Sequence, residues 1–431
     1  MSISIVILSA GQGTRMKSST PKVLHKISGK SMLFHSIDVA KEVSDDITII
    51  LHHQEELIKE QINQHYQGIK YHTQDVENFS GTGGALKGLT LSSDRVLILN
   101  GDMPLITKES LEMLTSPESD IDMSVIELEN SSGYGRVVIE DSRVLEIVEE
   151  KDCTSQQREI KTVNAGIYCV KRDLLERYIP KLNNSNAQGE YYLTDIIKMA
   201  VDEGREVNPV YVSESEFKGV NSKLDLADAE IIMQRRIKES LMKMGVSMRL
   251  SDTIYIDIRA SFEGESFLDS GVTIEGYSKI INSHIKANSV IEDAIIENSQ
   301  VGPMARVRPD SVIRDTHIGN FVEVKKSTLN GVKAGHLSYI GDATIESGTN
   351  IGAGVITCNY DGKAKYQTII GKNVFIGSDT QLVAPVKVED DVLIGAGSTI
   401  TKDIKSGNLA ISRSPLKIID GFFYKFFGKR G

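Results

Sequence analysis

The sequence is short of cysteine, of positive charge and of long apolar runs. Its three cysteines, Cys153, Cys169 and Cys358, form no close pair and no metal-ligand spacing, so we expect neither a disulfide framework nor a zinc site. No stretch approaches the ~20 apolar residues of a membrane-spanning helix, and the first apolar run is too short for a signal peptide. Together these absences favour a cytoplasmic protein.

Basic residues are outnumbered in this chain. Lys and Arg total 49 against 59 Asp and Glu, which gives a formal net charge of −10. General nucleic-acid binding needs a basic face and is therefore not expected. A nucleotide can still bind, because a few local cations suffice. With 431 residues the chain is too long for one ordinary core, and we expect two or three domains.

The first apolar run, Ile3–Leu8, predicts a buried strand of a parallel sheet. A turn of small residues follows, in which Gly11 and Gly13 let backbone N–H groups approach a phosphate, with Arg15 and Lys22 as nearby cations. The third glycine of a dinucleotide loop and the Gly-Lys-Ser/Thr of a P-loop are both missing. The alternative is a surface turn whose basic residues are solvated, but open α/β sheets bind ligands at this end of a strand.

Residues 1–222 alternate short apolar runs with helical patterns, which predicts a Rossmann-like α/β sheet with helices on both faces. The further predicted strands are Ile47–Leu51, Arg95–Asn100, Met123–Leu128, Val163–Val170 and Val207–Val212. The predicted helices are Leu33–Val43, Glu55–Gln64, Ala85–Leu91, Lys108–Leu114 and Thr194–Glu203. A linker helix is expected over 223–245, where apolar residues recur at three- and four-residue steps, and a further domain over 246–431.

The second half of the chain has a six-residue rhythm. Apolar residues recur at this spacing in three series: Ile295, Val301, Val307 and Ile313; Val312, Ile318 and Val324; and Ile370, Ile376, Leu382, Val388, Ile394 and Ile400. Hexapeptide repeats of this kind form a left-handed parallel β-helix whose apolar residues point inward. Flat faces of such a coil commonly pack around a threefold axis. A pure solenoid can also be only a scaffold.

One interruption of the rhythm predicts a loop. Ile351 and Ile370 lie 19 positions apart instead of 18, and Thr357–Lys363 fall between them, so this segment should bulge from the coil. Shortly before it stands His336, in a setting of polar residues and glycines.

The order of these motifs resembles known families. The chain resembles the sugar-nucleotide pyrophosphorylases in the motifs L-S-A-G-x-G-T-R-M-x(4)-P-K, G-D-x-P-L, G-Y-G-R, V-E-x-K-D, N-x-G and G-V-N. With K-A-G-H-x-x-Y, N-I-G-A-G, C-N-Y-D-G and G-S-D-T-Q, nearly the whole chain resembles the bifunctional N-acetylglucosamine-1-phosphate uridylyltransferase/glucosamine-1-phosphate acetyltransferases. The resemblance implies acetyl transfer from acetyl-CoA to glucosamine 1-phosphate, then uridylyl transfer from UTP. The product, UDP-N-acetylglucosamine, would supply peptidoglycan and lipopolysaccharide precursors.

For the uridylyl site, the resemblance implies contacts to phosphate, uracil and sugar. The UTP- and UDP-N-acetylglucosamine-binding residues would be Leu8, Gly11, Gly13, Arg15, Lys22, Gln74, Gly81, Thr82, Gly135, Glu149, Asn164 and Asn221. Asp102 ends a predicted central strand, where a carboxylate suits a hard metal, and the resemblance makes it the Mg²⁺ ligand with Asn221. Gly81 and Thr82 also precede the helix expected at Ala85, whose amides would favour an anion or a base edge.

For the acetyl site, the resemblance implies that His336 is the general base, which takes a proton from the glucosamine ammonium. The sugar phosphate would be bound by Arg308, Lys325, Tyr339 and Asn350. Acetyl-CoA would be bound by Asn359, Tyr360, Ser378, Ala396 and Arg413, with Asn359 as an oxyanion donor. The site would be shared between subunits of a homotrimer.

Two rival functions remain open at this point. A pyrophosphorylase with a β-helix used only for assembly would not need the His336 motif, and a non-catalytic scaffold would not need the phosphate loop or the metal pair. The chain ends in GFFYKFFGKRG, which matches no shared motif. We expect this tail to fold back on its own trimer, and we do not expect membrane contact.

Overall fold

The computed structural model describes residues 2–116 and 118–428. The chain forms two compact units, residues 1–234 and 235–431. The division falls inside helix α7 (Lys223–Lys243), which lies in the range of the predicted linker helix.

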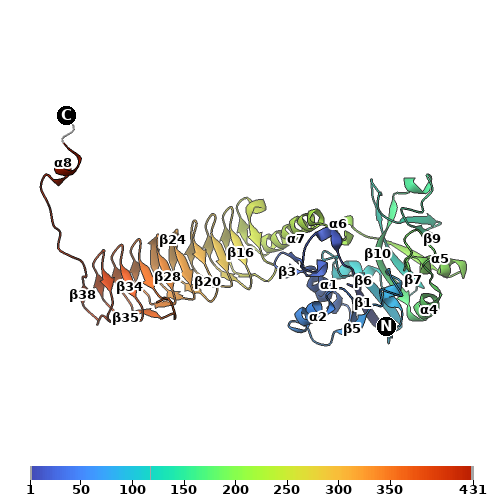
Figure 1. The fold of residues 1–431 in the computed structure, drawn as a ribbon, viewed down its shortest axis with the longest axis horizontal. Helices are drawn as coiled ribbons and strands as arrows, with labels where there is room; N and C mark the ends of the chain where they lie inside the picture. The colour runs from blue at the N-terminus through green and yellow to red at the C-terminus, as the bar shows by residue number, and fades with distance from the viewer. Residues whose placement is uncertain (1, 117, 429–431) are drawn as a thin grey trace. The chain divides into compact units, whose positions relative to one another are not determined.

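The first unit is built on one twisted sheet with the strand order β11-β7-β10-β6-β1-β4-β5 (Figure 1). Its strands are β1 (Ile3–Leu8), β4 (Ile47–Leu51), β5 (Lys70–Thr73), β6 (Arg95–Asn100), β7 (Ile121–Glu127), β10 (Thr162–Lys171) and β11 (Val207–Tyr211). β1 pairs in parallel with β4 and β6, whereas β10 runs antiparallel to β6 and β7. A hairpin of β8 (Arg136–Glu140) and β9 (Arg143–Val148) joins β10. The strands β2 (Lys26–Ile27) and β3 (Lys30–Ser31) form a separate small hairpin.

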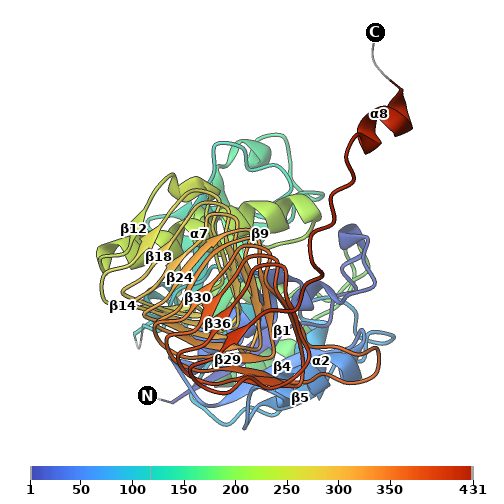
Figure 2. The same cartoon turned by 90° about the vertical axis from the view of Figure 1, so that its left-hand side faces the viewer.

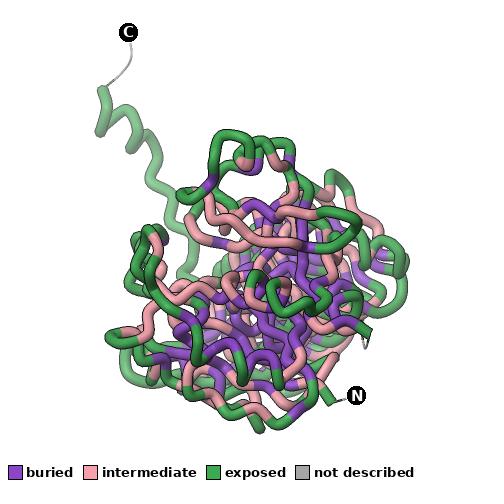
Figure 3. Tube along the Cα trace, turned by 90° about the vertical axis from the view of Figure 1, so that its right-hand side faces the viewer, coloured by how far each residue is buried: buried purple, intermediate pink, exposed green. Residues whose placement is uncertain are grey.

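Helices cover both faces of this sheet, which confirms the predicted α/β architecture. Alternate β1 residues enter two cores, Ile5 and Ile7 on one face and Val6 on the other. The first face is covered by α1 (Met32–Lys41), α2 (Glu55–Asn63), α3 (Lys108–Met113) and α6 (Glu214–Phe217). The second is covered by α4 (Arg172–Tyr178) and α5 (Asp195–Asp202). Figure 3 shows the buried centre of this unit beneath exposed segments.

One predicted helix is wrong. The segment Ala85–Leu91 forms a single 3-10 turn, η3 (Gly84–Leu86), instead of a helix. Gly88 then adopts the left-handed region with φ of +77°, which ends helical geometry, and glycine is a poor helix former. The expectation that amides of a helix start lie next to Gly81 and Thr82 is therefore also wrong.

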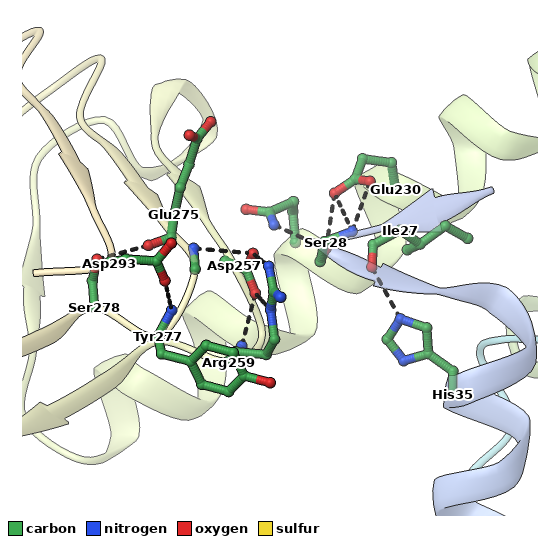
Figure 4. A network of polar contacts seen from close by, with 12 residues as sticks. Ile27, Ser28, His35, Glu230, Asp257, Arg259, Glu275, Tyr277, Ser278 and Asp293 are labelled. Carbon is green, nitrogen blue, oxygen red and sulfur yellow. Dashed lines mark hydrogen bonds and ion pairs between the residues drawn. The ribbon is translucent and has the colours of Figure 1, made fainter. Parts of the chain in front are cut away.

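Polar contacts tie the first part of α7 to the β2–β3 turn within the first unit. The Glu230 carboxylate accepts from the Ser28 backbone N–H at 2.9 Å and from the Ser28 hydroxyl at 2.8 Å (Figure 4). Gln234 donates to the same hydroxyl at 2.9 Å. These contacts hold the β2–β3 turn, which follows the 3-10 turn Lys22–Leu24 along the chain.

The second unit is a parallel β-helix of three sheets, as predicted from the hexapeptide rhythm (Figure 2). The first sheet contains β12 (Ser247–Met248), β15 (Phe267–Leu268), β18 (His284–Ile285), β21 (Gln300–Val301), β24 (His317–Asn320), β27 (Lys333–His336), β30 (Asn350–Ile351), β33 (Phe375–Ile376), β36 (Leu393–Ile394) and β38 (Leu409–Ala410). The second contains β13 (Tyr255–Ile256), β16 (Thr273–Glu275), β19 (Val290–Glu292), β22 (Arg306–Val307), β25 (Glu323–Lys325), β28 (Tyr339–Gly341), β31 (Ile356–Cys358), β34 (Gln381–Val383) and β37 (Thr399–Ile400). The third contains β14 (Ser261–Glu263), β17 (Lys279–Ile281), β20 (Ile295–Glu297), β23 (Val312–Arg314), β26 (Thr328–Asn330), β29 (Ala343–Ile345), β32 (Thr368–Ile370) and β35 (Val386–Val388).

A carboxylate organises the first coils. Asp257 accepts two bonds from the Arg259 guanidinium, at 2.9 and 2.6 Å, and one from the Gly276 N–H at 3.2 Å, which joins adjacent coils (Figure 4).

The inward residues follow the predicted series with two corrections. The series from Ile370 to Ile400 is buried throughout, but Ile295 and Val312 are only partly buried, and the inward residues of their strands are Ile296 and Ile313. The equivalent residues Ile280, Ile296 and Ile313 are 16 and 17 positions apart rather than 18. Asx residues at the corners, such as Asp293 and Asn298, adopt the left-handed region, which allows tighter turns with fewer residues.

The predicted loop is present. The segment between β31 and β32 leaves the coil, and a bridge between Tyr360 and Lys365 closes it. Its coil is longer than its neighbours, because the paired residues Ile345 and Ile370 are 25 positions apart.

The tail ends in a short helix, α8 (Phe422–Phe427). Ser412 and Arg413 still hydrogen-bond to Ser398 and Ala396 of the last coils. Every residue from 414 to 428 is exposed, so within a single chain this part of the tail does not fold back on the β-helix. Over the described residues, no helix combines the length and the apolar character that crossing a membrane requires.

Candidate functional site

The carboxyl ends of four neighbouring strands surround a cavity of about 390 Å³ in the first unit. Parallel strands place their carboxyl ends along one edge of the sheet, which is where open α/β sheets bind ligands. Seven residues that the sequence predicted for the nucleotide or metal line this cavity: Leu8, Gly11, Lys22, Gln74, Gly81, Thr82 and Asp102.

Gly13 shapes the loop beside Lys22. Its φ is +62°, and a Cβ atom at this position would lie 2.5 Å from Lys22 Cβ. Both observations require glycine, because other residues are strained at this φ and a side chain would displace Lys22. Gly13 therefore acts by letting the lysine side chain lie against the loop.

Four predicted residues meet beside this loop. The Lys22 ammonium forms an ion pair with the Asp102 carboxylate and donates to Asn221 Oδ1 at 3.0 Å. Arg15 Nη2 donates to the same amide oxygen at 2.9 Å. Asp102 and Asn221, from distant parts of the chain, thus turn their oxygens toward one cationic group.

This donor set fits a hard divalent ion. Mg²⁺ binds through one or two protein oxygens and completes its shell with water and substrate phosphates. A carboxylate and an amide oxygen that face a single cation supply such a pair. Over residues 2–116 and 118–428, no three His, Cys, Asp or Glu side chains gather as a metal-binding group. A metal here would therefore depend on substrate oxygens for the rest of its shell.

The glycine-rich segment at 81–84 packs tightly against the segment at 190–193. A Cβ on Gly81 would lie 2.7 Å from the Tyr191 carbonyl oxygen, and Thr82 Oγ1 accepts from the Leu193 N–H at 3.2 Å. The Gln74 amide is buried and donates to the Phe79 and Gly81 carbonyl oxygens, both at 2.9 Å. Gln74 thus holds this segment in place at the edge of the cavity.

Gly135, Glu149 and Asn164 come together at the β8–β9 hairpin. A Cβ on Gly135 would lie 3.5 Å from Glu149 Oε2, and the Asn164 N–H donates to the Gly135 carbonyl at 2.9 Å. Asn164 Oδ1 accepts from the Gly166 N–H at 2.9 Å, and the Gly166 carbonyl accepts from Asn100, a cavity residue, at 3.1 Å. These contacts connect the group to the cavity.

Glu149 is an unusual carboxylate. Burial raises its pKa, and the nearby Asp152 and Asp195 carboxylates raise it further, whereas a hydrogen bond from the Thr194 hydroxyl at 3.2 Å opposes the shift. A half-buried acceptor of this kind suits the hydroxyl groups of a neutral ring.

Six polar residues of the cavity were not predicted as site residues: Ser9, Gln12, His52, Ser80, Asn100 and Glu190. His52 directly follows β4 and Asn100 ends β6. Because both lie at the carboxyl ends of predicted strands, the sequence could have identified them as candidates. Glu190 lies in a loop, and no pattern in the sequence pointed to it.

On the β-helix, cations gather along the second sheet. Val307 pairs with Val324, which places Arg308 beside Lys325 on the next coil. Arg308 Nη1 forms an ion pair with Glu323 at 2.9 Å. Lys365, from the loop, lies close enough to lower the pKa of Lys325, and Arg308 adds to this effect. Lys365 was not predicted. The three cations outnumber the nearby carboxylates of Glu323 and Asp342, and this surplus of positive charge suits a phosphate.

Tyr339 and Asn359 meet one coil further on. A Cβ on Gly341 would lie 2.5 Å from the Tyr339 hydroxyl and 2.8 Å from Asn359 Nδ2. Asn359 Nδ2 donates to Asp342 at 2.5 Å, which fixes the direction of its amide. Tyr360 is exposed in the adjoining loop, where its hydroxyl donates to the Gly362 carbonyl at 2.8 Å.

His336, Ser378 and Ala396 lie in one column at a corner of the coils. Ala334 pairs with Ile351, Ile351 with Ile376 and Ile376 with Ile394, so the residues two positions later stack in order. Arg413 closes the column, since its Nη1 donates to the Ala396 carbonyl at 2.7 Å. Asn350 lies opposite Lys333 at the other end of its strand, so a single chain does not bring it to His336.

Comparisons with known proteins match both units. The family model of the MobA-like NTP transferase domain matches residues 5–165, and that of the bacterial transferase hexapeptide (six repeats) matches residues 367–402. A protein of Sulfurovum named "Bifunctional protein GlmU" is 70% identical over 430 residues, which cover 100% of both chains. Proteins of the same name from Nitratiruptor and Aliarcobacter butzleri are 60% and 58% identical and cover 100% and 99% of both chains.

Proposed function

This chain belongs to the bifunctional GlmU family and makes UDP-N-acetylglucosamine by two transfers, and we propose which residues carry each of them. The NTP transferase and hexapeptide matches correspond to the two activities. The substrates are small molecules: a sugar phosphate, acetyl-CoA and UTP.

In the first unit, an oxygen of N-acetylglucosamine 1-phosphate attacks the α-phosphorus of UTP in line, and pyrophosphate leaves. Arg15 and Lys22 neutralise phosphate charge beside the glycine loop, and Gly13 keeps Lys22 in place. Gln74, Gly81 and Thr82 form the uracil end of the cavity. Gly135, Glu149 and Asn164 bind the hydroxyl and N-acetyl groups of the sugar. Positioning and charge neutralisation carry this step, without a covalent intermediate on the protein.

The family's nucleotidyltransferase half uses a divalent metal ion, and in this chain the proposed ion is Mg²⁺. Asp102 and Asn221 would hold it, which is supported by the way their oxygens face one cationic group. When bound, the ion would neutralise charge on the triphosphate. Lys22 would then turn from these oxygens toward a phosphate.

In the second unit, the amine of glucosamine 1-phosphate attacks the thioester carbonyl of acetyl-CoA. An amide bond forms, the carbon–sulfur bond breaks and CoA leaves. His336 takes the ammonium proton so that the amine becomes a nucleophile. Arg308, Lys325 and Lys365 bind the sugar phosphate, with Tyr339 and Asn350 at the sugar. The Asn359 amide donates to the developing oxyanion. Tyr360, Ser378, Ala396 and Arg413 bind the coenzyme along the column of coil corners.

The proposed assembly is a homotrimer whose acetyl site combines residues of neighbouring copies. Asn350 does not reach His336 within one chain, and Phe375, Leu393 and Leu409 expose apolar side chains along one face of the β-helix. Both observations are explained if a second copy packs on this face. Since UTP and acetyl-CoA are cytoplasmic metabolites, the proposed place of work is the cytoplasm.

The observation that carries this proposal is that each unit brings predicted polar residues together: Lys22, Asp102 and Asn221 in the first, and Arg308 beside Lys325 in the second. The test uses purified wild type, His336→Ala and Asp102→Ala, each assayed separately for CoA release and for pyrophosphate release. We expect His336→Ala to lose only CoA release and Asp102→Ala to lose only pyrophosphate release. If the wild-type protein forms the UDP-sugar but does not acetylate glucosamine 1-phosphate, the β-helix is only a scaffold and the proposal for the second unit is contradicted.

A further inference from the structure

The described part of the tail exposes a run of apolar side chains. In α8, the residues Phe422, Phe423, Tyr424, Phe426 and Phe427 expose between 49 and 70% of their surface. Their rings contact one another, as in the pairs Phe423–Phe427 and Phe426–Phe427 with centroids 5.0 and 4.9 Å apart. Leu416, Ile418 and Ile419 are also exposed. The apolar surface therefore extends over the segment before the helix.

The aromatic side chains cover one broad face of this helix. At about 100° per residue, the five rings fall within an arc of about 200°, and Lys425 lies on the opposite side. A short helix with an aromatic face and a basic side suits the surface of a bilayer, where the rings enter the boundary of the acyl chains and the basic side stays among the headgroups.

The charge of the tail is opposite to that of the rest of the chain. Residues 414–431 include the basic residues Lys417, Lys425, Lys429 and Arg430 against the single acidic residue Asp420. This is a net charge of +3 in a chain whose formal net charge is −10, which leaves −13 on the remainder. An acidic body repels an anionic surface, so a basic aromatic tail is the part that such a surface would attract.

We propose that the tail after Arg413 binds the surface of an anionic phospholipid bilayer, with the aromatic rings of α8 at the interface and Lys417 and Lys425 against the headgroups. Ser414–Asp420 contain no helix or strand, and seven extended residues span up to about 25 Å. This tether lets the tail reach the surface while the β-helix stays in water. The binding is peripheral and reversible, because one short helix buries little apolar surface.

The experiment exploits the absence of tryptophan from this sequence. In the full-length protein, Phe423→Trp provides a single fluorescent reporter in α8. Its emission is measured with vesicles of phosphatidylglycerol and phosphatidylcholine, and with vesicles of phosphatidylcholine alone at the same salt. We expect a blue shift and co-sedimentation only with the anionic vesicles, and reversal in 1 M salt, where charge attraction acts over only about 3 Å.

Two variants in the Phe423→Trp background separate the contributions. Replacing Lys417, Lys425, Lys429 and Arg430 with Gln should lower the partition coefficient by about tenfold or more. The matched control replaces four exposed lysines of the last coils, Lys372, Lys387, Lys402 and Lys405, with Gln as well. We expect this control to leave the partition coefficient within about twofold. Both variants should keep both transferase activities, which shows that they fold.

Two results would overturn the proposal. An emission maximum that is already blue-shifted without vesicles, and that depends on protein concentration, would show that the tail docks on a second copy of the chain. An emission maximum that stays at the value of water-exposed tryptophan with every vesicle would show that the tail binds no bilayer.

Discussion

At the residue scale, Gly13 fixes where Lys22 can lie. Its left-handed backbone and the 2.5 Å approach to Lys22 Cβ both exclude a side chain. We expect Gly13→Ala to reduce pyrophosphate release by about tenfold or more, since the displaced ammonium forfeits a charge-assisted contact to phosphate, and to leave CoA release unchanged.

The matched control for this variant is Gly68→Ala. Gly68 also has a positive φ, of +78°, but an added Cβ would meet no atom within 4 Å. This variant carries the backbone strain alone, and we expect a small loss of stability with both activities intact. Equal loss of pyrophosphate release in the two variants would assign the effect to general destabilisation.

Glu149 gives a pH-dependent prediction. Because burial raises its pKa, the folded protein disfavours its charge. The resulting loss of stability begins near the unfolded carboxyl pKa of about 4.3, grows as pH rises to the raised folded pKa, and stays constant above it. We expect Glu149→Gln to raise the melting temperature of the first unit more at pH 8 than at pH 4, and to weaken binding of N-acetylglucosamine 1-phosphate.

Glu150 is the neighbouring control. Its carboxylate pairs with Arg136 at 2.6 Å, and this contact lowers its pKa. Glu150→Gln therefore removes a favourable charge and should not raise the melting temperature at pH 8. A rise in both variants would mean that the general negative charge of the region, rather than burial of Glu149, decides the effect.

At the scale of elements, the β-helix offers a test in two adjacent residues. Ile296 is fully buried and Ile295 is only partly buried on the outward side of the same strand. We expect Ile296→Ala to lower the stability of the second unit by about 2–5 kcal/mol and Ile295→Ala by less than about 1.5 kcal/mol, measured by denaturant unfolding. A larger effect at Ile295 would show that Ile295, as the six-residue series predicted, is the inward residue of this strand.

The same two residues show what the sequence could predict. The strict series from Ile370 to Ile400 is buried as expected, because the last coils keep 18 residues. In the earlier coils, residues such as Asp293 adopt the left-handed region and make the corners shorter. A strict six-residue count then falls on the residue next to the inward one. A corner conformation is decided by contacts between coils, which spacing alone does not encode.

In the first unit, the strands β1, β4 and β6 were predicted with their observed bounds, because long apolar runs buried on both faces are unambiguous. The hairpin β8–β9, which gathers Gly135 and Glu149, was not predicted as strands, since its residues are mixed and partly exposed. The candidate site residues were predicted from motifs, but the contacts between them, such as that of Asn221 with Lys22, depend on tertiary structure.

At the scale of the whole molecule, the two transfers should respond differently to metal removal. The proposed Mg²⁺ ligands lie in the first unit, and the acetyl transfer uses a histidine base and amide donor instead. We expect EDTA to abolish pyrophosphate release and excess Mg²⁺ to restore it, while CoA release continues. Loss of CoA release in EDTA would point to a metal requirement in the β-helix as well.

The long coil has a consequence for how such a protein can change over generations. On either side of the excursion at 359–367, the pairings Ile345–Ile370, Ile351–Ile376 and Thr357–Leu382 all advance by the same 25 positions. All three ladders therefore absorb the insertion together and continue in phase. A lineage can lengthen, shorten or rewrite this segment, and with it the ligand chemistry near Lys365, without having to re-evolve the scaffold on either side.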